Sequence, residues 1–435
     1  MITAVLPRRP PSRWLECNQM SFDDEPLALL GTILNGADGA GPAGEGAVIV
    51  EGGRIACVLQ KPDPASLPAR QLRADYVAPG FIDLQVNGGF GHEVADDPSA
   101  LLALARSLPA TGVTTFLPTL VSRPAARYGR CFAAFDVARA ATRVDPLSAR
   151  PLGLHLEGPL LSPARAGAHD RAAIEAATAS LLSQLADASR VALVTVAPER
   201  RDALMLITHL RARGIAVSLG HTDASFEMFT AAVDAGATLA THVWNAMSPL
   251  HHRAPGATGA ALSDDRVTAL AIADGVHTHP AAFTIALRAK GAERFGLVTD
   301  AVAAAGTPAG TVTALAGRPV ITTGAGARLE ARLEDGTLAG ATLTMDQAVR
   351  NARRFAGLSP ACAVHLATAV PARALGRLAD GPLLRAGAAA DLVLLDAELA
   401  VQATVIGGRL AYQRASAGAP GPDAGERPEA PARRR

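Results

Sequence analysis

Four ionisable side chains stand at the ends of four apolar runs in the sequence. Glu157 closes the run LGLHLE, His221 closes AVSLGH, His242 follows ATLAT, and Asp300 closes FGLVTD. Two imidazoles and one carboxylate are a common ligand set of catalytic zinc sites, and the set leaves one coordination position open for water. The remaining carboxylate can take the proton of that water and return it to a leaving group. These residue types predict metal-assisted hydrolysis.

Each of these residues also has a plainer interpretation. A polar side chain at the end of a strand often caps the helix that follows, and this accounts equally well for any one of the residues. The coincidence of several such positions favours a shared site.

The apolar runs belong to a repeated strand and helix pattern. From residue 80 to residue 375, strand-like runs such as TTFLPTL, VALVTVAP and TALAIADG alternate with Ala-rich segments typical of helices. Repeated βα units predict a parallel sheet, and their number over this length fits a closed, TIM-like (β/α)8 barrel. Residues just past the carboxyl end of each barrel strand face the active site. The ionisable side chains are therefore expected to lie together.

The two ends of the chain follow another pattern. Residues 25–79 and 376–413 contain short strand-like runs separated by Gly-containing turns, so we expect them to form one small β-sandwich domain. Residues 1–24 are expected to be a disordered leader, with Met20 as an alternative start to Met1. Residues 414–435, rich in Ala, Pro, Gly and charge, are expected to be a disordered tail.

Composition narrows the class of protein. The 435 residues are 49% hydrophobic and 4% aromatic, and they carry a formal net charge of +1 with acids and bases interspersed. This balance offers no basic face for nucleic acid or an anionic membrane, and no apolar run approaches the ~18 residues of a membrane span. The four cysteines are far apart, which is typical of a reduced, cytoplasmic protein. We expect a cytoplasmic protein with a small-molecule partner, no nucleic acid and no membrane.

The stretch PGFID resembles the opening of the amidohydrolase superfamily barrel. In that superfamily two histidines follow, one residue apart, and here Gln85 and Asn87 stand in their places. Neutral amides are poor metal ligands beside imidazole, so the resemblance implies one metal ion rather than two. Lys61 and Lys290 lie in no matching strand, which removes a bridging carboxylated lysine.

Further stretches resemble the N-acetylglucosamine-6-phosphate deacetylase family of that superfamily. The resemblance covers nearly the whole of residues 25–412. The stretches are GLHLEGPLLSPARAGAH, SLGHTDA, THVWNAMSPLHHRAPG, IADGVHTHP, LVTDA and LAGATLTMDQAV. The resemblance implies that Glu157, His221 and His242 bind one divalent metal ion per subunit. It also implies that Asp300 is the catalytic acid and base. Zinc is the expected ion, and iron, cobalt and manganese are alternatives because such a ligand set accepts them.

The resemblance also implies how a phosphorylated amino sugar is held at its phosphate. The main chain at Asn245 and Ala246 is expected to meet the phosphate, assisted by His277. Arg253 is expected to reach the phosphate in the neighbouring subunit of a homodimer. An arginine fork, a protonatable histidine and backbone donors suit a phosphate monoester. Taken singly, Arg253 is better explained as a solvated surface charge and His277 as a polar loop residue.

The remaining contacts concern the sugar ring and the acetyl group. Ala168 and His169 are expected to contact sugar hydroxyls, although His169 alone would be interpreted as an ordinary loop residue. The segment made of Leu338, Ala339 and Gly340 is expected to close over the acetyl end.

Other histidines receive no assigned role. His155 shares a strand face with Glu157, so it is either a partner that orients the site or, more simply, a packed barrel residue. His92, His251 and His252 match no contact of the family.

The function implied by the resemblance is hydrolysis of the acetamide of N-acetyl-D-glucosamine 6-phosphate to D-glucosamine 6-phosphate and acetate, in amino-sugar catabolism. One alternative keeps the chemistry and changes the substrate to N-acetylgalactosamine 6-phosphate or another N-acyl compound. A second alternative is a non-catalytic scaffold with this fold. Retention of Glu157, His221, His242 and Asp300 argues against the scaffold.

Overall fold

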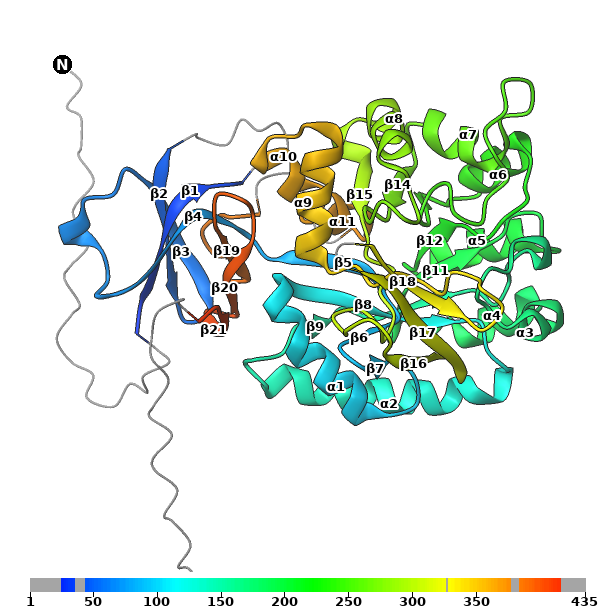
Figure 1. Cartoon of the computed structure of the whole chain (residues 1–435), viewed down its shortest axis with the longest axis horizontal. Helices are drawn as coiled ribbons and strands as arrows, with labels where there is room; N and C mark the ends of the chain where they lie inside the picture. The colour runs from blue at the N-terminus through cyan, green and yellow to red at the C-terminus, as the bar shows by residue number, and fades with distance from the viewer. Residues whose placement is uncertain (1–24, 36–43, 326–327, 377–382, 416–435) are drawn as a thin grey trace, which may run out of the picture.

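The structure is a computed structural model that describes residues 25–35, 44–325, 328–376 and 383–415. The predicted leader, residues 1–24, and the part of the predicted tail beyond residue 415 lie outside these ranges. Figure 1 shows a sheet-rich part made from both chain ends beside a larger part in which helices surround strands.

The larger part confirms the predicted (β/α)8 barrel. Within the described ranges, eight strands follow one another in hydrogen-bonded order, and every pair along this path is parallel. The strands are β5 Phe81–Val86, β8 Val113–Val121, β10 Leu154–Glu157, β11 Val191–Val196, β12 Ala216–Leu219, β13 Leu239–Ala240, β14 Thr268–Ala271 and β15 Phe295–Leu297. A short strand, β9 (Arg150–Pro151), pairs with β8 off this path.

Helices cover the outer face of the barrel strands, and side chains fill the interior of the barrel. Both faces are therefore buried, which is why the strands read as continuous apolar runs. The helices are α1 Pro98–Ser107, α2 Ala125–Val144, α3 Arg171–Ala176, α4 Ala179–Leu185, α5 Ala203–Ala212, α6 Phe226–Asp234, α7 Gly256–Ser263, α8 Pro280–Lys290, α9 Met345–Ala356, α10 Pro360–His365 and α11 Ala369–Ala374. Among the described residues, none of these helices is both long and apolar enough to cross a membrane.

Local signals explain where several helices begin. In α9, Thr344 and Gln347 form a capping box, and the buried residues Met345, Ala348 and Val349 recur at the spacing of one helical face. In α6, the hydroxyl of Ser225 accepts a hydrogen bond from the backbone of Met228. These helices pack their apolar faces on the barrel.

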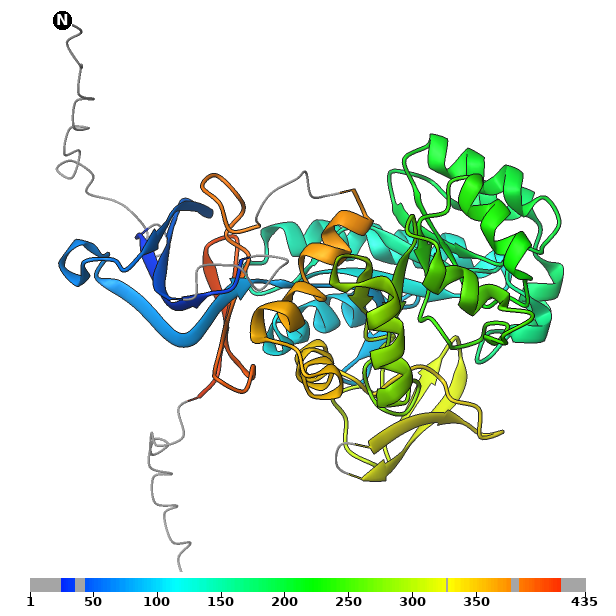
Figure 2. The ribbon, with the colours of Figure 1, turned by 90° about the horizontal axis from the view of Figure 1, so that it is seen from above.

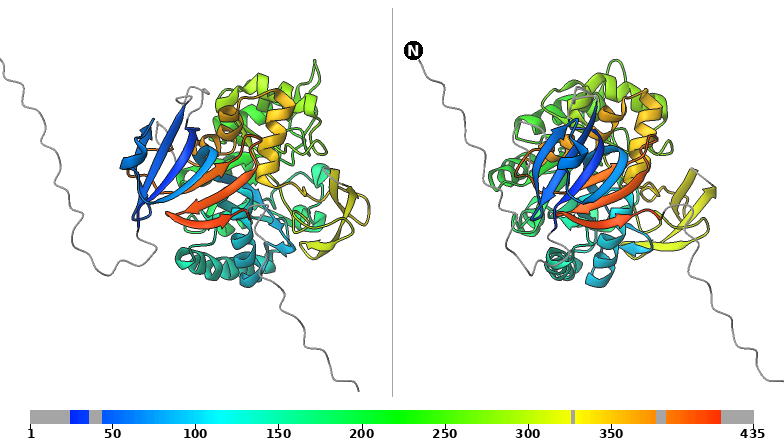
Figure 3. Two further views of the ribbon diagram at one scale, coloured as in Figure 1. Left: turned by 60° about the vertical axis from the view of Figure 1, so that its left-hand side comes forward. Right: turned by 90° about the vertical axis from the view of Figure 1, so that its left-hand side faces the viewer.

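The small domain is built from both ends of the chain, as predicted. In the described residues its strands form one sheet in the order β21-β20-β19-β4-β1-β2-β3. The bounds are β1 Leu27–Ile33, β2 Glu45–Glu51, β3 Arg54–Gln60, β4 Arg70–Pro79, β19 Leu392–Leu395, β20 Val401–Ile406 and β21 Arg409–Gln413. Figure 3 shows the first strands in blue beside the last in orange and red.

The core of this domain joins residues distant in sequence. Side chains such as Leu29, Val48 and Val77 pack with Leu392 and Val405 in one buried cluster. The joint between the two parts is β4, which pairs with β19 and continues through Gly80 into β5. At Gly80 a Cβ atom would lie 2.2 Å from Thr114, so only glycine fits this close passage.

A three-stranded antiparallel sheet, within the described residues, interrupts the chain after the last barrel strand. It consists of β16 Val312–Leu315, β17 Arg318–Ala325 and β18 Arg328–Leu333. Figure 2 shows it in yellow at one side of the barrel. Its Leu315, Val320 and Leu333 pack in one buried cluster with Val302, and Ala168 lies against that cluster. We refer to β16, β17 and β18 as the lid sheet.

A short hairpin joins the lid sheet to the barrel. Its strands are β6 Gly88–Gly89 and β7 His92–Glu93, directly after β5. The carboxylate of Glu93 accepts a hydrogen bond of 2.6 Å from the backbone N–H of Ala316. This contact ties the lid sheet to the mouth of the barrel.

Candidate metal and catalytic site

The structure brings the ionisable strand-end residues into one cavity. Glu157 is the last residue of β10, while His221, His242 and Asp300 follow closely after β12, β13 and β15. All of them line a cavity of about 470 Å³ at the carboxyl ends of the strands. The predicted grouping is therefore present.

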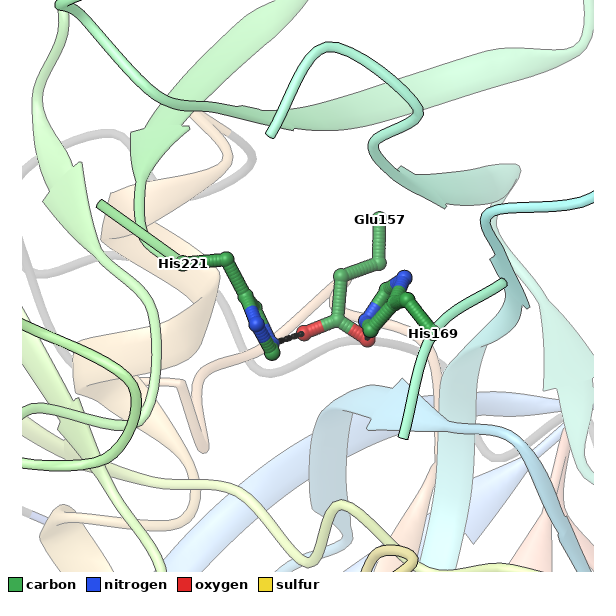
Figure 4. Close-up of side chains that lie close together, drawn as sticks. All are labelled: Glu157, His169 and His221. Atoms are coloured by element: carbon green, nitrogen blue, oxygen red, sulfur yellow. Dashed lines mark ion pairs between the residues drawn. The ribbon is translucent and has the colours of Figure 1, made fainter. Parts of the chain in front are cut away.

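The carboxylate of Glu157 is the centre of the group. Its Oε1 lies 3.0 Å from Nε2 of His242 and 3.4 Å from Nε2 of His221, and its Oε2 lies 3.4 Å from Nε2 of His169. Figure 4 shows the carboxylate between the rings of His169 and His221. These side chains are all buried. Burial raises the pKa of Glu157, but the imidazoles beside it hold that pKa well below its ordinary value.

The hydrogen bonds of His221 show which of its nitrogens is free to bind a cation. Its Nδ1 lies 2.8 Å from the carbonyl oxygen of Arg165, so this nitrogen donates a proton. In the neutral ring, Nε2 then carries a lone pair that faces Oε1 of Glu157. Two lone pairs repel each other unless a proton or a cation lies between them. His221 and Glu157 together fit a metal ion.

His169 has the opposite arrangement. Its Nδ1 accepts a hydrogen bond of 3.1 Å from the backbone N–H of Ser122, so in the neutral ring Nε2 carries the proton. The ligand atoms of Glu157, His169 and His221 lie within 4.8 Å of one another, close enough to hold an ion. The proton on Nε2 nevertheless makes His169 a donor rather than a ligand. Burial also lowers the pKa of His169 to about 4, which keeps the ring neutral.

His242 contacts the same carboxylate: its Nε2 forms a hydrogen bond of 3.0 Å with Oε1 of Glu157, which a bound cation would replace. Burial lowers its pKa, but the hydrogen bond to Glu157 and the charges of Glu157 and Asp300 raise that pKa above its ordinary value. Its Nδ1 is buried without a hydrogen-bond partner among the described residues. The donor set of one carboxylate and two imidazoles is one that a catalytic metal accepts.

Asp300 is connected to this centre by two amides. Its Oδ1 accepts hydrogen bonds of 2.7 Å from Asn87 and 3.0 Å from Gln85, and the same Gln85 nitrogen donates to Glu157 at 2.8 Å. Sequence reasoning identified Gln85 and Asn87 only as replaced ligands. Here the amide of Gln85 uses both of its N–H groups to hold two carboxylates together.

The environment of Asp300 suits proton transfer. Burial, followed by the charge of Glu157, raises the pKa of Asp300 to about 6. A carboxyl group with such a pKa can accept and release a proton near neutral pH.

The backbone of the site is unusual. His221, His242 and Asp300 have φ angles of 47°, 29° and 50°, and Trp244 and Ala246 have 84° and 51°. Residues other than glycine rarely adopt these left-handed backbone conformations. Each costs about 1–3 kcal/mol, and such conformations cluster at functional sites. The strain lets each strand turn sharply and aim its last side chain into the cavity.

Most of the predicted substrate contacts also line the cavity. They are Ala168, His169, Asn245, Ala246, His277, Leu338 and Gly340. Ala339 is fully buried beneath the lining. His277 is held by Asp274, whose Oδ2 lies 2.6 Å from Nδ1, so Nε2 is the nitrogen left for a ligand.

Arg253 is the exception. It is exposed and, in the described part of the chain, does not belong to the lining of the cavity. Its Nη1 lies 2.9 Å from Nε2 of His252, in a loop where His251 is also exposed. Arg253 and the two histidines are thus exposed and do not line the described cavity of their own chain.

Two arginines that line the cavity were not predicted from the sequence. Arg165 pairs with Asp223 at 2.7 Å, and Arg332 of β18 pairs with Glu330 through its Nε at 2.8 Å. Arg165 lies inside the motif GLHLEGPLLSPARAGAH and could have been selected there. Arg332 stands in a strand of alternating polarity, and no pattern marks it.

His155 proves to be a packed barrel residue. Its Nδ1 lies 3.1 Å from the carbonyl oxygen of Leu84 and its Nε2 lies 2.8 Å from the hydroxyl of Thr195. Burial lowers its pKa to about 4, so the ring is neutral. The hydroxyl group of Thr195 is hydrogen-bonded to that of Thr241, which is hydrogen-bonded to that of Ser218, so the three form a buried chain of hydroxyl groups.

The sequence is similar to those of known proteins. The family model described as Amidohydrolase family matches residues 76–411. The N-acetylgalactosamine-6-phosphate deacetylase of Escherichia coli O157:H7 is 40% identical over 356 residues, 81% of this chain and 91% of that protein. The human N-acetylglucosamine-6-phosphate deacetylase is 40% identical over 351 residues, 78% and 83% of the two chains.

A solved structure is similar as well. A mutant of N-acetyl-D-glucosamine-6-phosphate deacetylase from Mycobacterium smegmatis, in complex with N-acetyl-D-glucosamine-6-phosphate, superposes with a TM-score of 0.80 at 34% identity. The match covers 89% of this chain and 99% of that one. The strand-end residues, the barrel and the matched span lead to one conclusion. The chain belongs to the amidohydrolase family.

Proposed function

We propose that the protein is a metal-dependent hydrolase that cleaves the acetamide of N-acetyl-D-glucosamine 6-phosphate to D-glucosamine 6-phosphate and acetate, in cytoplasmic amino-sugar catabolism. One observation carries the chemistry: the buried side chains of Glu157, His221 and His242 meet in one cavity beside Asp300. The names of the relatives supply the substrate class.

Glu157, His221 and His242 hold one divalent cation per subunit. Zinc is our first candidate, and iron, cobalt and manganese suit the same ligands. The lone pair of His221 that faces Glu157 supports a cation at this place. When bound, the cation lowers the pKa of a water molecule and polarises the amide carbonyl.

Asp300 moves the proton. Its carboxylate accepts a proton from the attacking water as the new C–O bond forms, and it then delivers that proton to the nitrogen as the C–N bond breaks. The amides of Gln85 and Asn87 fix the orientation of the carboxylate. Without this proton the amine would be a poor leaving group.

His169 donates a hydrogen bond to a substrate oxygen. The backbone of Ser122 holds the proton of His169 on Nε2, on the cavity side of the ring. With its neighbour Ala168, this residue contacts the sugar. Leu338, Ala339 and Gly340 close over the acetyl end, at the base of the lid sheet.

The phosphate is bound away from the reacting carbon, which holds the amide in register. The main chain at Asn245 and Ala246 and the ring of His277 supply contacts from one subunit. Arg253 supplies a cation from the other subunit of a homodimer. Its exposure and its place outside its own cavity support this assignment.

The second candidate substrate is N-acetylgalactosamine 6-phosphate, because a relative that carries this name is 40% identical over 81% of the chain. The two sugars differ at one hydroxyl group, so a few contacts decide between them. The test is acetate release from both sugars by the full-length, metal-loaded protein. A higher kcat/KM for one sugar identifies the substrate. Release from neither sugar, in a preparation shown to hold metal, would contradict the proposal and favour another N-acyl substrate or a scaffold.

A further inference from the structure

The barrel closes between β15 and β5 in an unusual way. Among the described residues these two strands share no ladder, and the one bridge joins Val86, the last residue of β5, to Ala301, which lies beyond the end of β15. The backbone N–H of Asn87 donates to the carbonyl of Ala301 at 2.7 Å. Deeper in the barrel, the N–H groups of Ile82 and Leu297 donate to the segment around Ala367 instead of to each other. We call this junction the seam.

The middle of the seam is occupied by the carboxylate of Asp83. Its Oδ2 accepts a hydrogen bond of 2.6 Å from the hydroxyl of Thr299, and its Oδ1 accepts one of 3.2 Å from the backbone N–H of the same residue. Oδ1 also accepts from the backbone N–H of Gln85 at 3.2 Å. A side chain of β5 therefore supplies the hydrogen bonds that a strand ladder would supply elsewhere.

These contacts surround the backbone of Asp300. Thr299 precedes Asp300, and its hydroxyl oxygen accepts a hydrogen bond of 3.2 Å from Ala301, the residue that follows. Asp300 itself has a φ of 50°, a conformation that must be held by its surroundings. Through Thr299, Asp83 constrains the chain on both sides of that residue.

The same carboxylate also fixes the partner of Asp300. Asp83 binds the backbone N–H of Gln85, whose side chain donates to Oδ1 of Asp300 at 3.0 Å. One side chain thus sets the position of both the proton carrier and its hydrogen-bond donor.

Asp83 is costly to keep at this place. The residue is 1% exposed, and burying a carboxylate is unfavourable unless hydrogen bonds compensate. Burial raises its pKa to about 7. Two apolar side chains of similar size in place of Asp83 and Thr299 would close the seam at a lower cost in stability. The buried carboxylate therefore provides a specific alignment of the backbone rather than stability.

We propose that Asp83 is a positioning residue for Asp300: through Thr299 it closes the seam and holds the carboxyl of Asp300 against the amides of Gln85 and Asn87. Asp83 touches no reacting atom in this arrangement. The proposal rests on the proposed function, because only there is Asp300 the proton carrier.

The principal test is Thr299→Val, which keeps the shape of the side chain and removes the hydroxyl. In full-length, metal-loaded protein we expect kcat for acetate release to fall about 100-fold, the effect of a misplacement of about 1 Å. KM and the metal content should stay within about threefold of the wild type. Thr299→Ser keeps the hydroxyl and should recover most of the activity. Asp83→Asn should also lower kcat, and the double variant should lose little more than Thr299→Val, because the two residues act as one unit.

Asp391→Asn is the matched control. Asp391 is a partly buried carboxyl that accepts a hydrogen bond of 2.7 Å from the backbone N–H of Gly407 in the small domain and lies 3.4 Å from Arg150 of β9. This variant should lower the melting temperature without lowering kcat. Wild-type kcat in Thr299→Val would overturn the proposal, and so would a loss that Thr299→Ser shares or that follows a loss of metal or folded protein. If the wild type itself hydrolyses neither sugar, the proposed function fails and this role fails with it.

Discussion

His169 and His221 lie with their ring centroids 4.4 Å apart and turn Nε2 toward the same carboxylate, yet one presents a proton and the other a lone pair. The difference comes from the groups behind the rings. A backbone N–H faces Nδ1 of His169, whereas a backbone carbonyl faces Nδ1 of His221. Two identical side chains at one site therefore have different chemistry.

The first prediction separates these two roles. His221→Ala should reduce bound metal from about one ion per chain to nearly none, whereas His169→Asn should keep the metal. Loss of one preorganised donor should lower kcat of His169→Asn by about 100-fold. Mass spectrometry measures the bound metal of each variant, and acetate release measures its kcat. Equal loss of metal in the two variants would contradict the assigned tautomers.

The second prediction concerns proton transfer. Asp300→Asn should lower kcat by about 10²- to 10⁴-fold, because an amide can neither accept nor deliver the proton. Bound metal should stay nearly unchanged, since the proposed ligands Glu157, His221 and His242 are intact. Acetate release and metal analysis on one preparation are the measurements. Full activity of this variant would refute the mechanism.

The third prediction tests the bridging amide. Gln85→Leu keeps the size of the side chain but leaves Glu157 and Asp300 without their shared donor. We expect kcat to fall at least about tenfold, because one hydrogen bond to a charged group contributes about 1.5 kcal/mol. Gln71→Leu, which changes an exposed glutamine of β4, serves as the control. The role of Gln85 is excluded if both variants keep wild-type kcat.

The fourth prediction concerns Arg253. Arg253→Ala should raise KM for the phosphorylated sugar about 10- to 100-fold, while Arg328→Ala, an exposed arginine of β18, should not.

Complementation between subunits checks whether Arg253 acts across an interface. Mixed dimers of Arg253→Ala with Asp300→Asn contain one site that has Asp300 from the first chain and Arg253 from the second. Activity at low substrate concentration should return on mixing. If mixing restores nothing in dimers shown to exchange subunits, Arg253 does not serve the partner's site.

The fifth prediction follows from the pKa of Asp83, which burial raises to about 7 from an ordinary value of 3.8. The folded protein then binds this proton more tightly than the unfolded chain does. Its contribution to stability is fully present below pH 3.8 and is lost as the pH rises through about 7. Relative to Asp83→Asn, the metal-free wild type should therefore lose stability between about pH 4 and pH 7 and change little above that. Chemical denaturation across this range is the measurement, and a constant difference would show that Asp83 does not titrate there.

Much of the fold could be predicted because barrel strands are buried on both faces. Their apolar runs end where the chain leaves the sheet, so the sequence alone places Glu157 and Asp300 at one end of the barrel. The two halves of the small domain could be paired for a similar reason, since neither half has enough strands to bury its own apolar face.

The lid sheet and the seam could not be predicted in this way. The strands of the lid sheet carry charged residues such as Arg318 and Arg332 and lie inside the span expected to hold βα units, so their antiparallel sheet was not predicted, although β18 alternates in polarity. The role of Asp83 depends on Thr299, which is 216 residues away, and on a ladder that does not form in the described seam. The tautomer of His169 depends in the same way on Ser122, because a residue type does not reveal which backbone group will face it.

The small domain has a consequence for how the chain folds during synthesis. In its sheet, Val77, Ala78 and Pro79 of β4 pair with Leu394, Val393 and Leu392 of β19, so β4 lacks this partner until the C-terminal part of the chain is made. The partner strands emerge from the ribosome only after the whole barrel has emerged. Until then the edge of β4 is unprotected, and an open edge can pair with another nascent chain. A chain truncated before residue 392 lacks the strand that pairs with β4, so this edge stays open in it.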